Sequence, residues 1–145
     1  MIDWEPDDLT VGLLGVERAY REAFMCWQWD QSAGELSRGG SIVSHGYAGR
    51  DRGKNNPAMQ AAVGVGPIPR GHWRITGVHD SPNTGPYTII LEPALGTDTC
   101  GRSAFRIHGD SIRHPGQASH GCIILPRAVR ERIMRSGDRD LLVVA

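Results

Sequence analysis

The sequence predicts a mainly β domain, a β-rich α+β fold flanked by two helices. Turn-forming residues are frequent, with 19 Gly and 9 Pro among 145 residues, and the runs between the turns are rich in β-branched and aromatic residues. Only two stretches carry the apolar spacing or the end signals of a helix. A chain of this length forms one domain and buries a core without a metal or a disulfide.

The charge balance excludes several classes of partner. Sixteen Lys and Arg balance sixteen Asp and Glu, which argues against long-range attraction to nucleic acid or to an anionic membrane. No apolar run reaches the 18 or so residues of a membrane span, so we expect no membrane insertion. The acidic N-terminus lacks the basic and apolar regions of a Sec signal peptide, which predicts synthesis in the cytoplasm and export by another route.

Residues 1–24 are expected to form a helical lead to a single domain over residues 25–145. Apolar residues from Leu9 to Phe24 follow the spacing of an amphipathic helix. From Met25 to Leu36, alternating large residues are interrupted by a Ser-Ala-Gly turn, which predicts a β-hairpin. The tryptophans Trp27, Trp29 and Trp73 are expected in the core.

The remaining elements follow from turn residues and apolar runs. Residues 38–71 are rich in Gly, Asn and Pro, which predicts only short strands and a turn of helix near Pro57 to Ala62. Downstream, the expected elements in chain order are strands at His72–His79, Tyr87–Leu91, Ala104–His108 and Ile123–Leu125, a helix at Ala128–Met134 that follows Pro126 and ends by Ser136-Gly137, and a last strand at Asp140–Val144.

The residues His108-Gly109 and Ser119-His120-Gly121-Cys122 point to nucleophilic chemistry. A cysteine nucleophile needs an imidazole that lowers its pKa or takes its proton, and backbone N–H donors for the developing oxyanion. Cys122 can be the nucleophile and His108 the base, because the fourteen residues between them allow the chain to return. The N–H groups of Gly121 and Cys122 are the expected oxyanion donors. Taken alone, Cys122 equally fits a buried core residue, and His108 a core or surface histidine.

This ordered set resembles the signature of the YkuD-type L,D-transpeptidases of bacterial cell-wall synthesis. The resemblance implies an L,D-transpeptidase-like β-sandwich or barrel with one or two flanking helices and no metal or other cofactor. It also implies that Cys122 attacks the carbonyl after meso-diaminopimelate in a peptidoglycan stem peptide, releases the terminal D-alanine and passes the acyl group to an amine or water. His108 would be the base, the Gly109 carbonyl its orienting acceptor and His120 a helper lining the site.

A closer likeness covers Trp27 to about Ile133 and looks like the small L,D-transpeptidase effectors of type VI secretion systems. That likeness implies delivery by the secretion apparatus into the periplasm of a rival bacterium, and a cognate immunity protein in the producing cell. The segments that carry it are Trp27, the Gln31–Leu36 turn, Gly46-Tyr47-Ala48-Gly49, Asn55-Asn56-Pro57 with Gln60, Gly66-Pro67-Ile68-Pro69 with Gly71, Arg102-Ser103 with Phe105, and the His-Gly and Ser-His-Gly-Cys elements.

Five residues are candidates for substrate binding, and each has a plainer alternative. Housekeeping transpeptidases usually carry an arginine two residues after the cysteine, where this chain has Ile124. Strand alternation predicts that Arg102, Ala104, Arg106 and His108 share one face of a strand. If that face lines the cleft, Arg102 or Arg106 can take the place of the missing arginine. The alternative is that both arginines are simply solvated. Asp110 can bind a substrate ammonium or form a turn. Tyr47 can cap the cleft or pack against its neighbours, and Ser119 can contact substrate or belong to a turn.

Two other functions remain open at this stage: hydrolysis of an unrelated amide by the same dyad, and non-enzymatic binding to peptidoglycan or a partner with Cys122 as packing. If Cys122 is the nucleophile, Cys26 and Cys100 are left over, and they can pair in an oxidising compartment.

Overall fold

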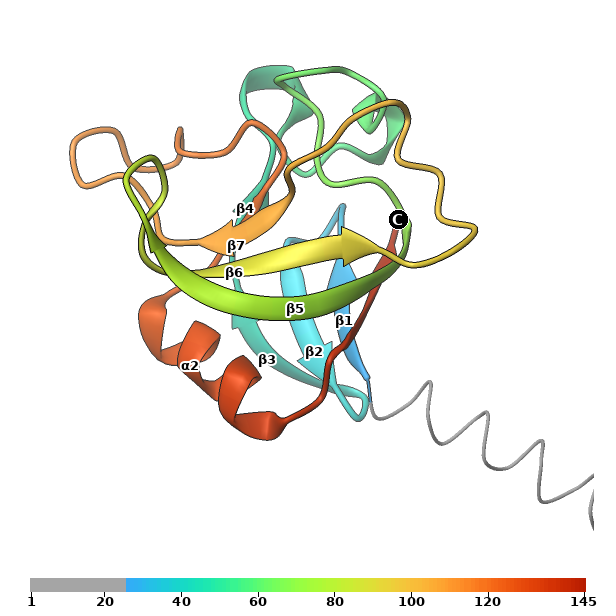
Figure 1. Ribbon diagram of the computed structural model, residues 1–145. Coiled ribbons are helices and arrows are strands. Elements are labelled where there is room, and N and C mark those ends of the chain that lie inside the picture. Colours follow the sequence, from blue (N-terminus) through green and yellow to red (C-terminus); the bar gives the residue numbers. More distant parts are fainter. Residues whose placement is uncertain (1–25) are drawn as a thin grey trace, which may run out of the picture.

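The computed structural model describes residues 26–145 as one nine-stranded sheet with the order β3-β2-β1-β9-β5-β6-β7-β8-β4 (Figure 1). The prediction of a mainly β fold is confirmed, and the described strands form a single sheet and no closed barrel. The helical lead over residues 1–24, with its amphipathic helix from Leu9 to Phe24, lies outside the described residues.

The predicted N-terminal hairpin is confirmed. β1 (Trp27–Asp30) and β2 (Glu35–Arg38) pair antiparallel, and β2 pairs in turn with β3 (Ser41–His45). The turn between β1 and β2 places Gly34 at a φ of 66°, a left-handed conformation that glycine adopts without strain. Because side chains alternate along β1, Trp27 and Trp29 point into the core together.

The centre of the sheet is built from both ends of the described chain. β9 (Asp140–Val144) lies between β1, to which it is parallel, and β5 (Gly71–Ser81), to which it is antiparallel. β5 forms a long hairpin with β6 (Gly85–Pro93). These strands were all expected from the sequence, although β5 and β6 extend further at both ends than their apolar runs predict.

The opposite side of the sheet carries three short strands. β7 (Arg106–His108) pairs antiparallel with β6, β8 (Ile123–Ile124) is parallel to β7, and β4 (Tyr47–Ala48) is antiparallel to β8. The predicted strand from Ala104 is wrong at its start. Ala104 has a φ of 64°, which is incompatible with a strand, so the expected alternation from Arg102 to His108 holds only for Arg106 and His108.

The two outermost strands of the sheet are consecutive in the chain. Gly46 alone separates β3 from β4, and its N–H donates to the Gly34 carbonyl at 2.9 Å. A Cβ at Gly46 would overlap the Ile124 carbonyl oxygen. The absence of a side chain at position 46 therefore lets the chain cross from one edge of the sheet to the other.

Helical structure is short. The 3-10 turn η2 (Pro57–Met59) lies where a turn of helix was expected, and another, η1 (Asp51–Gly53), precedes it. α2 (Arg127–Ser136) follows Pro126 and ends at Gly137, whose φ is 74°, as predicted. α2 packs against β6 and β7. Within residues 26–145, no helix has both the length and the apolarity needed to cross a bilayer.

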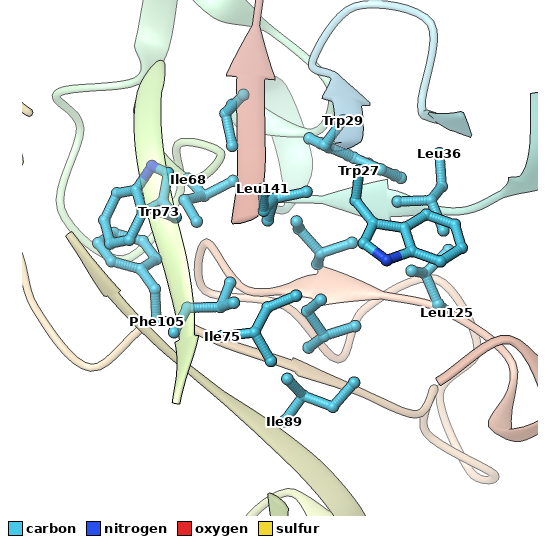
Figure 2. Packing of buried hydrophobic residues seen from close by; sticks show 14 of the residues in the cluster. Trp27, Trp29, Leu36, Ile68, Trp73, Ile75, Ile89, Phe105, Leu125 and Leu141 are labelled. Carbon is cyan, nitrogen blue, oxygen red and sulfur yellow. The ribbon is translucent and has the colours of Figure 1, made fainter. Parts of the chain in front are cut away.

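The core lies inside the curl of the sheet, with β5 and β6 passing in front of β1 to β3 (Figure 1). Figure 2 shows Trp73 and Phe105 at one end of the buried cluster and Trp27, Leu36 and Leu125 at the other. The rings of Trp73 and Phe105 meet edge to face at 5.1 Å. Two indole N–H groups have partners, since Trp27 donates to Ser136 Oγ and Trp73 to the Pro69 carbonyl. The expectation that three tryptophans form the core is confirmed.

Gly46→Ala should lower the free energy of unfolding by about 2 kcal/mol or more, because the new methyl group overlaps a backbone carbonyl that cannot move without disturbing β8. Gly77→Ala in β5 is the matched control, since a Cβ there has open space around it. Urea unfolding followed by tryptophan fluorescence measures the free energy of unfolding of both variants. Equal stability of the two variants would contradict the close approach at position 46.

Candidate active site

The parallel pairing of β7 with β8 sets the geometry of the candidate site. Ile107 pairs with Ile123, and both side chains are fully buried in the core. Alternation then places His108 on the opposite face of β7 from Ile107, and Cys122, which directly precedes β8, on the opposite face from Ile123. The predicted nucleophile and the predicted base therefore share one face of adjacent strands.

The His108 ring is held in one orientation. Its Nδ1 lies 2.9 Å from the Gly109 carbonyl oxygen, and because a carbonyl can only accept, Nδ1 carries the hydrogen and Nε2 the lone pair. Burial lowers the pKa of His108, and the charge of Arg130 lowers it further, against the opposing effects of the Gly109 hydrogen bond and of Asp110. The ring is therefore neutral near pH 7 and able to accept a proton at Nε2.

The Cys122 thiol is also neutral at rest. Its Sγ lies 3.8 Å from the Ala104 carbonyl oxygen, to which the S–H can donate. Burial raises the pKa of the Cys122 thiol, and the Arg106 backbone N–H and the charges of Arg106 and Arg102 only partly offset this. Of the two ways an imidazole can assist a thiol, this favours proton transfer during the reaction over a preformed thiolate.

Cys122 lies at the border of two hollows. One, of about 640 Å³, is lined by Cys122, His108 and His120, with Asn83 and Thr84 from the tip of the β5–β6 hairpin. The other, of about 420 Å³, is lined by Cys122 and His120 together with residues 101–105 and Val63. A substrate carbonyl at the thiol therefore has space for chain on both of its sides.

Ser119 shapes the turn that presents the thiol. The side chain is fully buried, and its Oγ donates to the Cys122 carbonyl at 2.5 Å. The same oxygen accepts from the N–H groups of Gly49 at 2.8 Å and Gly121 at 3.0 Å. Of the two roles considered for Ser119 from the sequence, these contacts support the one in the turn. The Gly121 N–H is likewise engaged within the turn, which leaves the Cys122 N–H as the expected oxyanion donor.

Arg102 is committed to backbone carbonyls. It is 9% exposed, and its two terminal nitrogens donate to four carbonyl oxygens at 2.7–3.0 Å, those of Gln60, Gly66, Pro67 and His120. A Cβ at Gly121 would lie 2.5 Å from Arg102 Nη2, so this glycine lets the guanidinium approach. Arg102 therefore joins the 60–67 loop to the turn before Cys122, and its terminal nitrogens are occupied by backbone carbonyls.

Arg106 projects on the same face of β7 as His108, and its Nη1 donates to the Phe105 carbonyl at 2.9 Å. Its charge acts on the Cys122 thiol. Of the two arginines considered from the sequence, Arg106 keeps more N–H donors available for a ligand.

Tyr47 and Asp110 bind each other. The Tyr47 hydroxyl donates to Asp110 Oδ1 at 2.6 Å and accepts from the Ala118 N–H. Burial and the Asp110 contact raise the pKa of Tyr47 to about 12. Burial alone would raise the pKa of Asp110, but hydrogen bonds from Tyr47, Ser111 and Gly116 and the nearby Lys54 charge hold it below its usual range. This pair therefore fastens the 109–118 loop to β4, which is a tethering role beyond the substrate roles predicted.

Sequence reasoning missed Arg130. The residue lies on α2, is 5% exposed and acts on the pKa of His108. Its spacing from Ile133, also buried, was an available signal, because residues three apart share a helix face and an arginine on an apolar face needs partners. The described residues contain no disulfide and no group of three metal-ligating side chains.

Comparison with protein families identifies most of the described chain. A family model described as the Tlde1 domain matches residues 43–142, a range that includes Tyr47, His108 and Cys122. The sequence matches no curated protein and no solved structure.

Arg102→Lys should lower the free energy of unfolding by about 3 kcal/mol, because a lysine ammonium cannot reach four carbonyls in a plane and leaves some of them buried and unpaired. Arg70→Lys, at an exposed position of the neighbouring segment, should change it by less than about 0.5 kcal/mol. Chemical denaturation of the two variants tests this, and an unaffected Arg102→Lys protein would mean that the four contacts contribute little.

Iodoacetamide should label Cys122 more slowly at pH 7 than it labels N-acetylcysteine, because the raised pKa leaves little thiolate. The rate should climb about tenfold per pH unit and change little in His108→Ala. Mass spectrometry of the alkylated peptide measures the labelling rate of Cys122 at each pH and in each variant. Fast labelling between pH 5 and 7 that disappears in His108→Ala would instead indicate a thiolate–imidazolium pair.

Proposed function

Since the chain belongs to the Tlde1 domain family, a family of type VI secretion effectors, we propose that it is a cysteine-dependent L,D-transpeptidase or L,D-carboxypeptidase of peptidoglycan. Its substrate is the tetrapeptide stem, cut after meso-diaminopimelate. The observation that carries the proposal is the placement of Cys122 and His108 on one face of the parallel β7–β8 pair, with both side chains lining one hollow.

Acylation begins with both groups neutral. As Cys122 Sγ attacks the stem carbonyl, the thiol proton passes to His108 Nε2, and the negative charge moves to the carbonyl oxygen. The Cys122 N–H can donate to this oxygen, since it has no carbonyl partner among the described residues. When the C–N bond breaks, the His108 imidazolium gives its proton to the departing D-alanine amine, and a thioester remains on Cys122.

Deacylation uses the same groups in reverse. His108 Nε2 takes a proton from water or from an incoming amine as that group attacks the thioester. When the C–S bond breaks, the His108 imidazolium returns this proton to Cys122 Sγ, and the neutral thiol is restored. Water yields the tripeptide, a free D-amino acid yields an exchanged tetrapeptide, and a second stem yields a cross-link. The hollow on the other side of Cys122, lined by residues 101–105 and Val63, supports access for such an acceptor.

The fixed ring and the fixed turn support this cycle. The Gly109 carbonyl keeps His108 in one tautomer, while Ser119 and Arg102 hold the turn that carries the thiol. Groups held this way lose little freedom when the substrate arrives, which lowers the barrier by pre-orienting the reactants.

The proposed site of action is the periplasm of a target bacterium, reached through the type VI secretion apparatus. Trimming or exchanging the fourth residue of the stem removes donors for cross-linking and weakens the wall. A producing cell then needs an immunity protein. These statements rest on family membership and on the catalytic proposal together.

Incubation with disaccharide-tetrapeptide should yield tripeptide, or an exchanged tetrapeptide when a free D-amino acid is added. Cys122→Ala should abolish both products, and His108→Ala should lower kcat by about 10²- to 10⁴-fold. Cys100→Ala is the matched control, since this thiol is outside the site, and should retain activity. Mass spectrometry of the muropeptides reads the outcome.

Product from the folded Cys122→Ala protein would contradict the nucleophile. A protein that leaves stem peptides intact but hydrolyses a generic amide would keep the dyad and overturn the substrate. Loss of both activities in every preparation, with peptidoglycan still bound, would favour a binding module.

A further inference from the structure

A third hollow, of about 820 Å³, adjoins the candidate catalytic cleft. It lies between the tip of the β5–β6 hairpin, the loop after β7 and the start of α2. Asn83, Thr84, Gly109 and Asp110 line both this groove and the cleft that holds Cys122. Gly109 directly follows His108, so a ligand that fills the groove reaches to within one residue of the proposed base.

Arg130 forms part of the wall of this groove and is held rigidly there. Nε donates to the Leu125 carbonyl at 3.0 Å, and Nη1 donates to the carbonyls of Pro86 at 2.9 Å and Tyr87 at 2.6 Å. Nη2 donates to no group among the described residues. A Cβ at Gly109 would lie 2.9 Å from Nη2, so this nitrogen lies against the backbone next to His108. Arg130 as a whole residue is 5% exposed, and Nη2 is the guanidinium nitrogen without a hydrogen-bond partner among the described residues.

Carboxylates compensate the charge around Arg130 only in part, because the Glu131 charge acts on it but forms no ion pair with it. Arg113, Arg127 and Arg130 line the groove, and Asp110 is the one carboxylate among its lining residues. Asp110 already accepts hydrogen bonds from Tyr47, Ser111 and Gly116. Arg127 pairs with Glu131 at 2.9 Å, whereas no carboxylate of residues 26–145 lies within ion-pair distance of Arg130. A buried cation without a carboxylate in direct contact is costly unless a ligand supplies one.

The start of α2 adds to this positive potential. The first turn contains no acidic residue, and its N-cap, Pro126, has no side-chain acceptor for the free N–H groups. The N-terminal end of a ten-residue helix carries a partial positive charge that favours an anion. Beside it, Ile124, Leu125 and Pro86 give the groove an apolar wall. The combination fits a short aliphatic chain that ends in a carboxylate.

We propose that Arg130 Nη2 and the first turn of α2 form a carboxylate subsite that binds an acidic side group of the stem peptide while its scissile carbonyl lies at Cys122. This inference rests on the proposed function. Two groups of the stem have the required chemistry: the free carboxylate of its γ-linked D-glutamate and the side-chain carboxylate of its diaminopimelate. The terminal carboxylate leaves with D-alanine and is a separate group.

The first experiment changes the substrate and keeps the wild-type protein. Three tetrapeptides are compared: the native one, one with the D-glutamate carboxyl amidated, and one with the diaminopimelate side-chain carboxyl amidated. One of the two amides should raise KM by about tenfold or more with little change in kcat, because a contact outside the reacting centre stabilises substrate and transition state alike. The affected amide identifies the group bound. KM values within twofold for all three peptides would overturn the subsite.

The second experiment assigns the effect to Arg130. Arg130→Gln should raise KM for the native peptide to the value for the sensitive amide and remove the difference between the two. Arg132→Gln, at an exposed position of the same helix, is the matched control and should preserve the difference. An Arg130→Gln protein that folds and still discriminates would overturn the role of Arg130. If it does not fold, the peptide series still decides whether a carboxylate is recognised.

A third measurement separates this subsite from the proposed catalysis. Acetate is titrated into ¹⁵N-labelled wild-type protein, with acetamide as the neutral control. Saturable shifts of the Arg130 Nε–H and of the backbone N–H signals of Arg127 and Ala128 with acetate alone would support the subsite even if no stem peptide is turned over. Equal shifts with acetamide, or none, would overturn it independently of the enzymatic result.

Discussion

The parallel register of β7 and β8 is the constraint on which the candidate site depends. One face of this two-strand unit places Ile107 and Ile123 in the core, and the other carries His108 and the approach to Cys122. Slipping the register by one residue would exchange core and cleft residues on one strand, so the hydrophobic core itself enforces the juxtaposition. β7 is in turn paired with β6 and through it with β5 and β9. The proposed chemistry is therefore attached to the most extensively paired part of the sheet.

Two buried arginines hold separate segments of the chain together through hydrogen bonds to backbone carbonyls. Arg102 donates to carbonyls from two separate segments, and Arg130 joins α2 to the start of β6 and to the residue after β8. Each guanidinium offers five donors in a plane, enough to satisfy several carbonyls that irregular backbone leaves unpaired. Neither is neutralised by an acidic side chain among the described residues, so both keep their positive charge close to the cleft. Structural cross-linking and the electrostatics of the site are thus supplied by the same groups.

Local patterns predicted most of the elements because those elements are local. Alternation and a Ser-Ala-Gly turn indicated the first hairpin, and Pro126 and Gly137 bracketed α2. The ordered His-Gly and Ser-His-Gly-Cys motif drew attention to the two side chains that the sheet brings together. The roles of Ser119, Arg102 and Arg130 could not be predicted in this way, because each of them also binds backbone groups that lie 18 to 70 residues away in the chain. The left-handed conformation of Ala104 was not predicted, because it is imposed by the surroundings of this residue and not by its own propensity.

The single-residue link at Gly46 ties together the two ends of the sheet. β3 pairs with β2 and β4 pairs with β8, so β3 and β4 stand at the two ends of the nine-strand order, yet they belong to one uninterrupted stretch of chain. Fraying at one edge therefore pulls on the other, and the edges cannot open as independent units. Sub-global opening of this domain involves residues 41–48 as one cooperative segment, and because β4 pairs with β8 directly after Cys122, such an opening would loosen the thiol along with the sheet.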